Sequence, residues 1–196
     1  MASFTPKKIT GKWKQGYALD LHTSSSQFIG YNESGHPLFD TKYSDVGNLL
    51  HQLKSKGDSS VVPQIVKAVE EWMKKWKPDV DLLIPVPPNN LRKIQPVLVM
   101  AEAISERLKI PIVDCVKKTR DISQQLKNVS NREEKRKLLD GLHTVDKSAV
   151  QGKKILLFDD LYSSGETMSA ITTVLHEQGH ATAVFALAIT QTRSRK

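Results

Sequence analysis

Cysteine is almost missing from this sequence of 196 residues, because Cys115 is the only one. A single thiol cannot form an internal disulfide, which excludes the disulfide-stapled folds of small secreted proteins. The first ten residues, MASFTPKKIT, also lack the apolar region of a secretory signal. We therefore expect a protein of the reducing cytoplasm, and we interpret Cys115 as a small buried residue.

Long hydrophobic runs are missing as well. A stretch such as VFALAI, which begins at Val184, is far below the roughly 20 residues that a membrane-spanning helix requires. The sequence has no internal repeat, and its 39% of hydrophobic residues are enough to form one core. These observations predict a soluble protein with no membrane partner and a single domain over residues 1–196.

Acidic residues are outnumbered: 21 aspartates and glutamates stand against 29 lysines and arginines, so the net charge is +8. This excess favours an anionic ligand, either a polyphosphate metabolite or nucleic acid, although a solvated lysine-rich surface explains it equally well. Residues 117–137 contain no aromatic side chain on which single-stranded nucleic acid could stack, which favours phosphate there. The basic residues of this segment are Lys117, Lys118, Arg120, Lys127, Arg132, Lys135, Arg136 and Lys137.

The first 43 residues are typical of a polar β region. The β-like stretches YALDLHT and QFIGYN are followed by the turn residues of NESGHPLF, which predict a hairpin. Apolar residues then recur at helical spacing in residues 44–57 and 61–77, which predicts two helices. We expect Trp72 and Trp76 to lie on the apolar face of the second helix and to belong to the core.

Residues 81–190 alternate between strand and helix patterns, with one long basic connection between them. This order is typical of a parallel sheet covered by helices on both faces. We therefore predict an α/β fold in which residues 44–196 form the α/β core and residues 1–43 its N-terminal β region. Strands are expected at residues 81–87, 110–116, 153–158 and 181–190, and helices at residues 96–108 and 167–178.

Two adjacent acids, Asp159 and Asp160, follow an apolar strand and precede the turn SSGET. Parallel sheets bind ligands at the carboxyl ends of their strands, which is where these acids fall. A helix that begins directly after the turn offers free N–H groups to a phosphate, and Gly165 allows a close approach. Carboxylates beside such a site suit sugar hydroxyls and a hydrated Mg²⁺. The pattern predicts a phosphorylated ribose as the ligand.

The stretch ILLFDDLYSSGET resembles the phosphoribosyl pyrophosphate (PRPP) motif of type I phosphoribosyltransferases, with its apolar strand, two acids, hydroxyl-rich turn, glycine and threonine. The resemblance implies that fold, with an N-terminal β-hairpin and helical region added. It also implies that the two acids hold the ribose and that the turn holds its 5′-phosphate. The implied PRPP-binding residues are Asp159, Asp160, Leu161, Tyr162, Ser163, Ser164, Gly165, Glu166 and Thr167.

Two further stretches resemble the competence protein F branch of that superfamily. LLIPVPPNNLRKIQPVLVMAEAI is similar to a strand end and arginine-bearing loop, and QLKNVSNREEKR is similar to the branch's mobile segment. The resemblance implies that both contact pyrophosphate. The implied residues are Pro87, Pro88, Arg92, Lys127, Arg132 and Arg136.

These similarities predict an Mg²⁺-dependent enzyme that transfers phosphoribose from PRPP to an unidentified nucleophile and releases pyrophosphate. Its catalytic residues would be Asp159, Asp160 and Arg92, acting through charge and positioning. The alternative is a non-catalytic regulator that binds PRPP or a nucleotide, or an accessory protein of DNA uptake or repair. The expected partner is PRPP or a compound that contains ribose 5-phosphate, ahead of nucleic acid, and the sequence allows a homodimer.

Four residues, two in the motif and two in the basic connection, carry more detailed expectations. Ser163 stands where purine-salvage members often carry a carboxylate, which argues against hypoxanthine or guanine as acceptor. Glu166 is interpreted as a solvent-facing acid in the first turn of a helix. Ser130 and Glu133 match a capping box, which predicts a short helix within the basic connection.

Two other patterns suggest different functions and are set aside. HEQGH, from His176 to His180, matches a zinc protease motif by letter, but Gly179 should end the helix between the histidines, so we expect no zinc site. A strand that ends in two aspartates also occurs in phosphorelay receiver domains. There the pair lies near the start of the chain and needs another aspartate on a later strand, and ATAVFALAIT ends in none.

Overall fold

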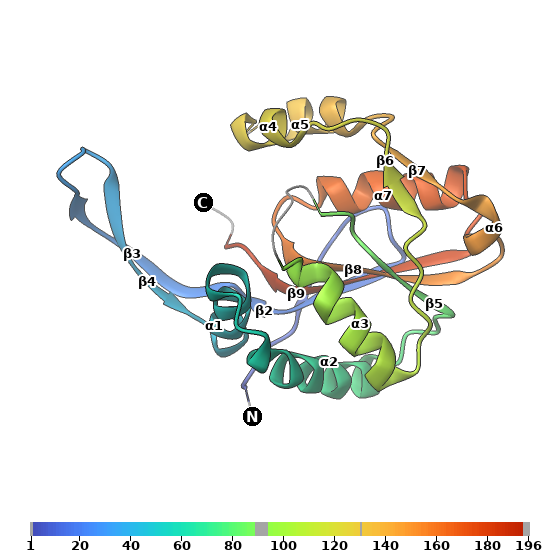
Figure 1. Cartoon of the computed structure of the whole chain (residues 1–196), viewed down its shortest axis with the longest axis horizontal. Helices are drawn as coiled ribbons and strands as arrows, with labels where there is room; N and C mark the ends of the chain where they lie inside the picture. Colours follow the sequence, from blue (N-terminus) through green and yellow to red (C-terminus); the bar gives the residue numbers. More distant parts are fainter. Residues whose placement is uncertain (1, 89–93, 130, 194–196) are drawn as a thin grey trace.

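A computed structural model describes residues 2–88, 94–129 and 131–193. Its centre is a five-stranded sheet in the order β1-β2-β9-β8-β5 (Figure 1). Strands β2, β9, β8 and β5 are mutually parallel, and β1 pairs antiparallel with β2 at one edge. The strands are β1 Lys7–Lys8, β2 Gln15–Leu21, β5 Leu82–Pro85, β8 Lys154–Tyr162 and β9 Ala183–Gln191.

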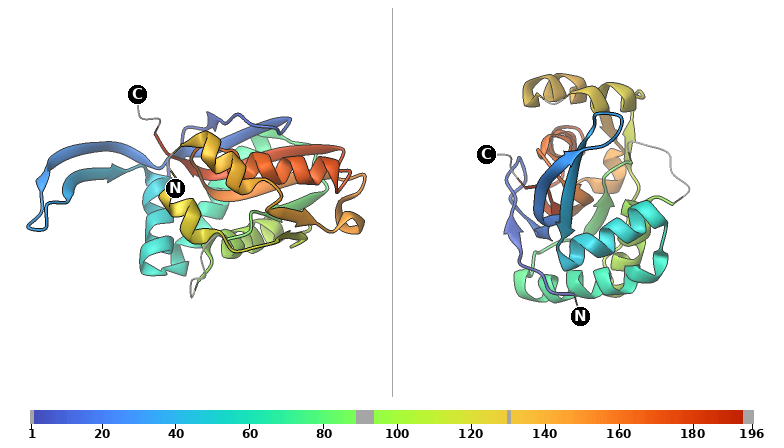
Figure 2. Two further views of the ribbon diagram at one scale, coloured as in Figure 1. Left: turned by 90° about the horizontal axis from the view of Figure 1, so that it is seen from above. Right: turned by 90° about the vertical axis from the view of Figure 1, so that its left-hand side faces the viewer.

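Helices cover both faces of this sheet, as predicted, and the α/β fold is confirmed (Figures 1 and 2). Successive side chains of a strand point to opposite faces. Leu156 and Phe158 of β8 accordingly pack with α1, α2 and α3, whereas Ile155 and Leu157 pack with α7. These main helices are α1 Asp45–His51, α2 Val62–Trp76, α3 Pro96–Leu108 and α7 Glu166–Glu177.

The first helical segment changes from an α-helix to a π-helix before it ends. Ser44 caps α1 by accepting a hydrogen bond from the Gly47 N–H at 2.9 Å. After α1 the helix continues as a π-helical turn, Gln52–Lys56. This turn ends at Gly57, which adopts the left-handed conformation. A short 3₁₀ turn, Ser59–Val61, then leads into α2. Such π-helical turns are frequent at functional sites.

The two tryptophans of α2 pack against the core, as the helical pattern predicts. Both rings meet Tyr17 of β2 edge-to-face, with centroids 4.9 and 5.2 Å away. The Trp76 indole N–H donates to Gln15 Oε1 at 3.0 Å, which satisfies a polar group that burial would otherwise penalise. Helix α2 is therefore fixed to β2.

The sequence patterns differ from the structure in two strands. Residues 110–116 form no long strand: Ile112 makes a single parallel bridge to Leu83, and Pro111 has no N–H to extend the ladder. β2, which the sequence groups with the N-terminal β region, lies inside the main sheet between β1 and β9. Parallel pairing joins residues far apart in sequence, so local patterns do not reveal it.

The basic connection is largely structured. It contains a small antiparallel sheet, helices α4 and α5, and a cluster in which Ile122, Leu139 and Leu142 pack near Ala170 of α7. Asn131 caps α5 by accepting from the Glu133 N–H at 2.9 Å, whereas the expected cap Ser130 lies outside the described residues. The elements are β6 Val116–Lys118, α4 Ser123–Asn128, α5 Arg132–Leu139, β7 His143–Val145 and α6 Lys147–Val150.

The predicted hairpin is present and extends away from the rest of the molecule (Figures 1 and 2). Its strands, β3 Thr23–Tyr31 and β4 Pro37–Tyr43, pair antiparallel as a separate two-stranded sheet. We call residues 23–43 the arm. Among the residues that the structure describes, no helix has both the length and the hydrophobicity needed to cross a membrane.

Candidate functional site

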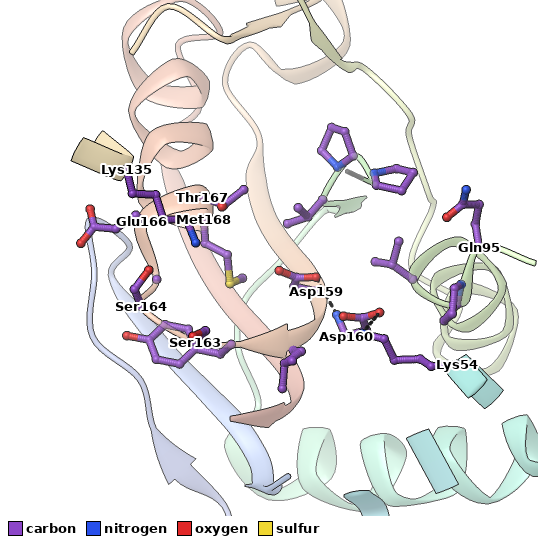
Figure 3. A pocket seen from close by; sticks show the side chains of 18 residues that line it. Lys54, Gln95, Lys135, Asp159, Asp160, Ser163, Ser164, Glu166, Thr167 and Met168 are labelled. Carbon is purple, nitrogen blue, oxygen red and sulfur yellow. Dashed lines mark hydrogen bonds and ion pairs between the residues drawn. The ribbon is translucent and has the colours of Figure 1, made fainter. Parts of the chain in front are cut away.

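The paired acids lie at the carboxyl end of β8, which continues beyond them to Tyr162. The strand is therefore longer than predicted and holds both acids in regular backbone geometry, Asp159 opposite Ala188 of β9. The Asp160 N–H donates to Asp159 Oδ1 at 2.8 Å. Both carboxylates face the same cavity (Figure 3).

The turn after β8 is built around Gly165. This residue has φ +76° and precedes the first residue of α7. A Cβ added there would lie 2.7 Å from the Tyr162 ring, which is held in place by a 2.9 Å hydrogen bond from its hydroxyl to Thr10 O. Glycine is thus required both by conformation and by space. The tight turn leaves the N-terminus of α7 open toward the cavity.

Ser164 supplies a buried polar group to the site. Its Oγ is buried, and no hydrogen-bond partner for it exists among the described residues. A buried hydroxyl without a partner is costly, and such groups call for a specific explanation. Because Ser164 also lines the cavity, a bound ligand is a natural partner for it.

The cavity has a volume of about 230 Å³ and is lined by residues from five separate segments of the chain. The sequence predicted that Pro87 and Pro88 would join the motif, and the structure brings them together. Arg92 lies outside the described residues, as does the side chain of Lys127. The other lining residues outside the motif are Lys54, Val86, Gln95, Pro96, Val97, Lys135 and Met168.

Glu166 is buried, with 5% of its side chain exposed, so its interpretation as a solvent-facing acid is wrong. Arg136 Nε lies 2.6 Å from Glu166 Oε2, and Arg132 Nε lies 3.2 Å from Oε1. Arg132 also donates to Ser164 O at 2.8 Å. Burial alone would raise the pKa of Glu166, but the hydrogen bonds and charges of Arg136 and Arg132 lower it below its usual range. The two arginines, predicted to contact pyrophosphate, therefore hold α5 to the start of α7.

Lys54 is a site residue that sequence reasoning missed. It comes from the π-helical turn after α1, and its Nζ lies 2.9 Å from Asp160 Oδ2, with the two side chains 22% and 16% exposed (Figure 3). The sequence shows only a lysine near the end of an amphipathic helix, which is the usual pattern of a solvated cation. Its role depends on a contact that spans more than 100 residues of sequence and that no local pattern indicates.

The two acids lie in different surroundings, because Lys54 pairs directly with Asp160 and Asp159 is buried without such a pair. Burial and the charge of Asp160 raise the pKa of Asp159 to about 7, while Lys54 acts weakly in the opposite direction. Asp160 itself is held by the direct ion pair. The pKa of His22 is lowered mainly by burial, and the charges of Lys54 and His51 lower it further. Asp159 is thus the acid whose charge most needs a cation or hydroxyl donors from a ligand.

The zinc-like pattern has a structural explanation. α7 ends at Glu177, before Gly179, and His180 adopts the left-handed conformation with φ +54°. His176 Nδ1 lies 3.0 Å from Ala181 O, so one of its nitrogens already has a partner. Over residues 2–88, 94–129 and 131–193, no group of three histidines, cysteines or acids is arranged to hold a metal ion.

Together, the fold and the site define an α/β protein with a candidate ligand site at the carboxyl edge of a parallel sheet. A family model described as the phosphoribosyl transferase domain matches residues 97–196, just over half of the chain. The chain therefore belongs to the phosphoribosyltransferase domain family. A search of curated proteins found no match.

One solved structure supports the fold, and two others are similar with TM-scores below 0.5. The adenine phosphoribosyltransferase of Trypanosoma brucei, in complex with AMP, pyrophosphate and ribose 5-phosphate, is 14% identical with a TM-score of 0.50, covering 96% of this chain and 75% of that one. The enzyme of Leishmania donovani is 13% identical with a TM-score of 0.49, covering 95% and 75%. The allosteric regulatory enzyme of purine biosynthesis is 18% identical with a TM-score of 0.43; 76% of this chain is covered, but only 28% of that one. The likeness at such identities concerns the fold alone.

Proposed function

We propose that this protein binds PRPP with Mg²⁺ and transfers phosphoribose to a nucleophile, with release of pyrophosphate. One observation carries the proposal: the paired acids and the turn of residues 163–167 line a single cavity at the carboxyl edge of the sheet. Membership in the family supports the general reaction. The resemblance of residues 82–104 to the competence protein F branch suggests the subgroup within it.

The turn and the acids would hold opposite ends of the ribose 5-phosphate. Backbone N–H groups at the start of α7 and the unpartnered Ser164 hydroxyl would donate to the 5′-phosphate, aided by the helix dipole. Asp159 and Asp160 would accept hydrogen bonds from the vicinal ribose hydroxyls. Lys54 would hold Asp160 in place through its ion pair.

Mg²⁺ fits the chemistry of these residues, because it prefers oxygen ligands and keeps several waters. Asp159 would hold it best, since this carboxylate carries a charge that burial and Asp160 disfavour. When bound, the ion would neutralise charge that builds up on the departing pyrophosphate. Lys135, which lines the cavity, would position the pyrophosphate together with Arg92, while Pro87 and Pro88, which have no backbone N–H, would only shape the wall of the site.

Binding of ribose 5-phosphate tests the proposal most directly. In calorimetry with Mg²⁺, Asp159→Asn combined with Asp160→Asn should weaken binding by at least about tenfold, since each lost charge-assisted hydrogen bond costs about 1.5–3 kcal/mol. Asp140→Asn, at an exposed aspartate, serves as the control and should bind as the wild type does. Equal binding by wild type and double variant would remove the sugar-binding role.

Turnover is tested separately from binding. The protein is incubated with PRPP, Mg²⁺ and one nitrogenous base at a time. Pyrophosphate should be released only with the correct base, which identifies the acceptor. The absence of a carboxylate at Ser163 argues against hypoxanthine and guanine. Tight PRPP binding with no release for any acceptor would favour the alternative, a regulator that binds PRPP or a nucleotide.

A further inference from the structure

The start of α7 combines the proposed phosphate site with a buried negative charge. Glu166 is the first residue of this helix, is buried, and lines the cavity (Figure 3). An acid in the first turn stabilises a helix, but here the carboxylate would share the helix N-terminus with a bound 5′-phosphate. Two anions in one site that is shielded from water repel each other strongly. A phosphate therefore binds favourably here only if the charge of Glu166 is compensated.

Two cations of α5 supply this compensation. Arg136 reaches both oxygens of the Glu166 carboxylate, with Nε 2.6 Å from Oε2 and Nη2 3.3 Å from Oε1. Arg132 Nε lies 3.2 Å from Oε1, and its Nη2 donates to Ser164 O at 2.8 Å. The carboxylate is thus bound by two guanidinium groups, one of which also holds the turn of residues 163–167. Both contacts are charge-assisted hydrogen bonds, the strong kind.

The position of the two arginines argues against direct contact with the ligand. Glu166 and the turn line the cavity at the paired acids, whereas neither Arg132 nor Arg136 is among its lining residues. Arg136 instead lines a different cavity, of about 500 Å³, which is formed mainly by residues of α5 and α7 and to which Glu166 also belongs. The sequence predicted that the arginines contact pyrophosphate, but their contacts lie at the end of the site where the 5′-phosphate would bind.

From these contacts we infer that Arg132 and Arg136 are positioning residues of the 5′-phosphate site: they neutralise Glu166, which would otherwise repel the phosphate. The inference rests on the proposed function, because it takes ribose 5-phosphate as the ligand. It gives α5 a role in phosphate recognition without any contact between the arginines and the ligand.

The coupling between α5 and the phosphate is reciprocal. If the ion pairs with Glu166 favour phosphate binding, bound phosphate must favour these pairs by the same factor. Bound phosphate would therefore hold α5 against the start of α7. Because α5 also carries Lys135, which lines the cavity, binding of the 5′-phosphate would keep a further cation at the site.

Calorimetry with ribose 5-phosphate and Mg²⁺ tests the compensation. Arg132→Gln combined with Arg136→Gln should weaken binding at least about tenfold, because the carboxylate then faces the phosphate without its partners. Adding Glu166→Gln to this double variant should restore the affinity to within about threefold of the wild type, since the repulsion is removed. Lys137→Gln combined with Lys147→Gln is the matched control: it removes two charges from exposed lysines and should bind as the wild type does.

Restoration by Glu166→Gln separates positioning from direct contact. If the arginines touched the ligand, the triple variant would bind as weakly as the double variant, and that result would overturn the inference. Equal binding by wild type and double variant would overturn it as well, as would a loss confined to the binding of pyrophosphate. Thermal unfolding should show that all variants are folded, because the two arginines are about two-thirds exposed. A wild type that does not bind ribose 5-phosphate would instead overturn the proposed function and the inference with it.

Hydrogen exchange tests the reciprocal effect on α5. Saturating ribose 5-phosphate with Mg²⁺ should slow exchange of the α5 amides several-fold in the wild type, because opening of α5 would leave Glu166 uncompensated beside the bound phosphate. The same ligand should leave α5 exchange unchanged in Glu166→Gln, which still binds it but lacks the ion pairs. Equal slowing in wild type and variant would show that the ligand orders α5 by another route and would contradict the inference.

Discussion

At the scale of single residues, Asp159 is a site acid whose charged form the folded protein disfavours. The carboxylate is disfavoured by burial and by its neighbour Asp160, and Lys54 compensates Asp160 directly rather than Asp159. The proposed binding of a cation and sugar hydroxyls accounts for this property, because the ligand would supply the missing partners. Removing the charge should therefore stabilise the free protein while it weakens ligand binding.

Asp159→Asn should accordingly raise the melting temperature without ligand, increasingly so at higher pH. Asp159 ionises near its ordinary pKa of 3.8 when unfolded but near about 7 when folded, so the folded state binds this proton more tightly. The resulting stability is present below about pH 4 and is lost as the pH rises toward 7, whereas asparagine loses nothing. The gain at pH 8 should be on the order of 1–3 kcal/mol, or several degrees.

Calorimetric melting between pH 4 and pH 8 in buffers without divalent ions measures this difference. Asp140→Asn is the control, because that side chain is exposed, and it should show no pH-dependent gain. If wild type and Asp159→Asn melt in parallel across this range, the electrostatic strain assigned to Asp159 is absent.

At the scale of elements, α5 is attached to α7 by a contact that the sequence conceals. The segment carries many exposed charges, yet Arg132 and Arg136 converge on the one acid of α7 that is buried at its first turn. Because the arginines are about two-thirds exposed, water partly screens the pair, so its effect on global stability is modest. We expect its main effect to be local: it should hold α5 next to the turn of residues 163–167.

Glu166→Gln should therefore release α5 without unfolding the molecule. Hydrogen exchange of the amides in α5 should accelerate several-fold, while exchange in α2 stays unchanged, because only the local opening becomes easier. Glu133→Gln is the matched control, since it removes an exposed ion pair with Lys137 on the same helix. Uniform acceleration in both helices would instead show that Glu166 supports the whole core.

The same contrast between local and distant interactions explains what the sequence could predict. The strand, acids, glycine and helix around Asp159 are contiguous, so the motif and its position at a strand end could be identified from sequence. The ion pairs of Lys54 and Glu166 join segments 106 and about 30 residues apart, and their partners are set by tertiary packing. The insertion of β2 into the parallel sheet was missed for the same reason.

At the scale of the whole molecule, the longest basic stretch of the chain has most of its cations paired with neighbouring groups. In residues 117–137, most of the cations donate to nearby carboxylates or carbonyl oxygens, and Lys135 lines the cavity. Cations that are already paired are poor ligands for a nucleic-acid backbone, because each must give up its partner first. Those that donate in this way are Lys117, Lys118, Arg120, Arg132, Arg136 and Lys137.

Nucleic acid should consequently bind weakly and with little dependence on salt. At physiological salt, duplex and single-stranded oligonucleotides should show dissociation constants no tighter than about 10 µM, with a log–log salt slope that corresponds to about two phosphate contacts or fewer. Fluorescence anisotropy over a series of salt concentrations measures both quantities, and ribose 5-phosphate with Mg²⁺ serves as the competitor. Lys135→Ala should weaken the binding of pyrophosphate, since this lysine faces the cavity, and should barely affect the oligonucleotides. Sub-micromolar, steeply salt-dependent binding that ribose 5-phosphate fails to displace would instead assign the positive charge to nucleic acid and favour an accessory role in DNA uptake or repair.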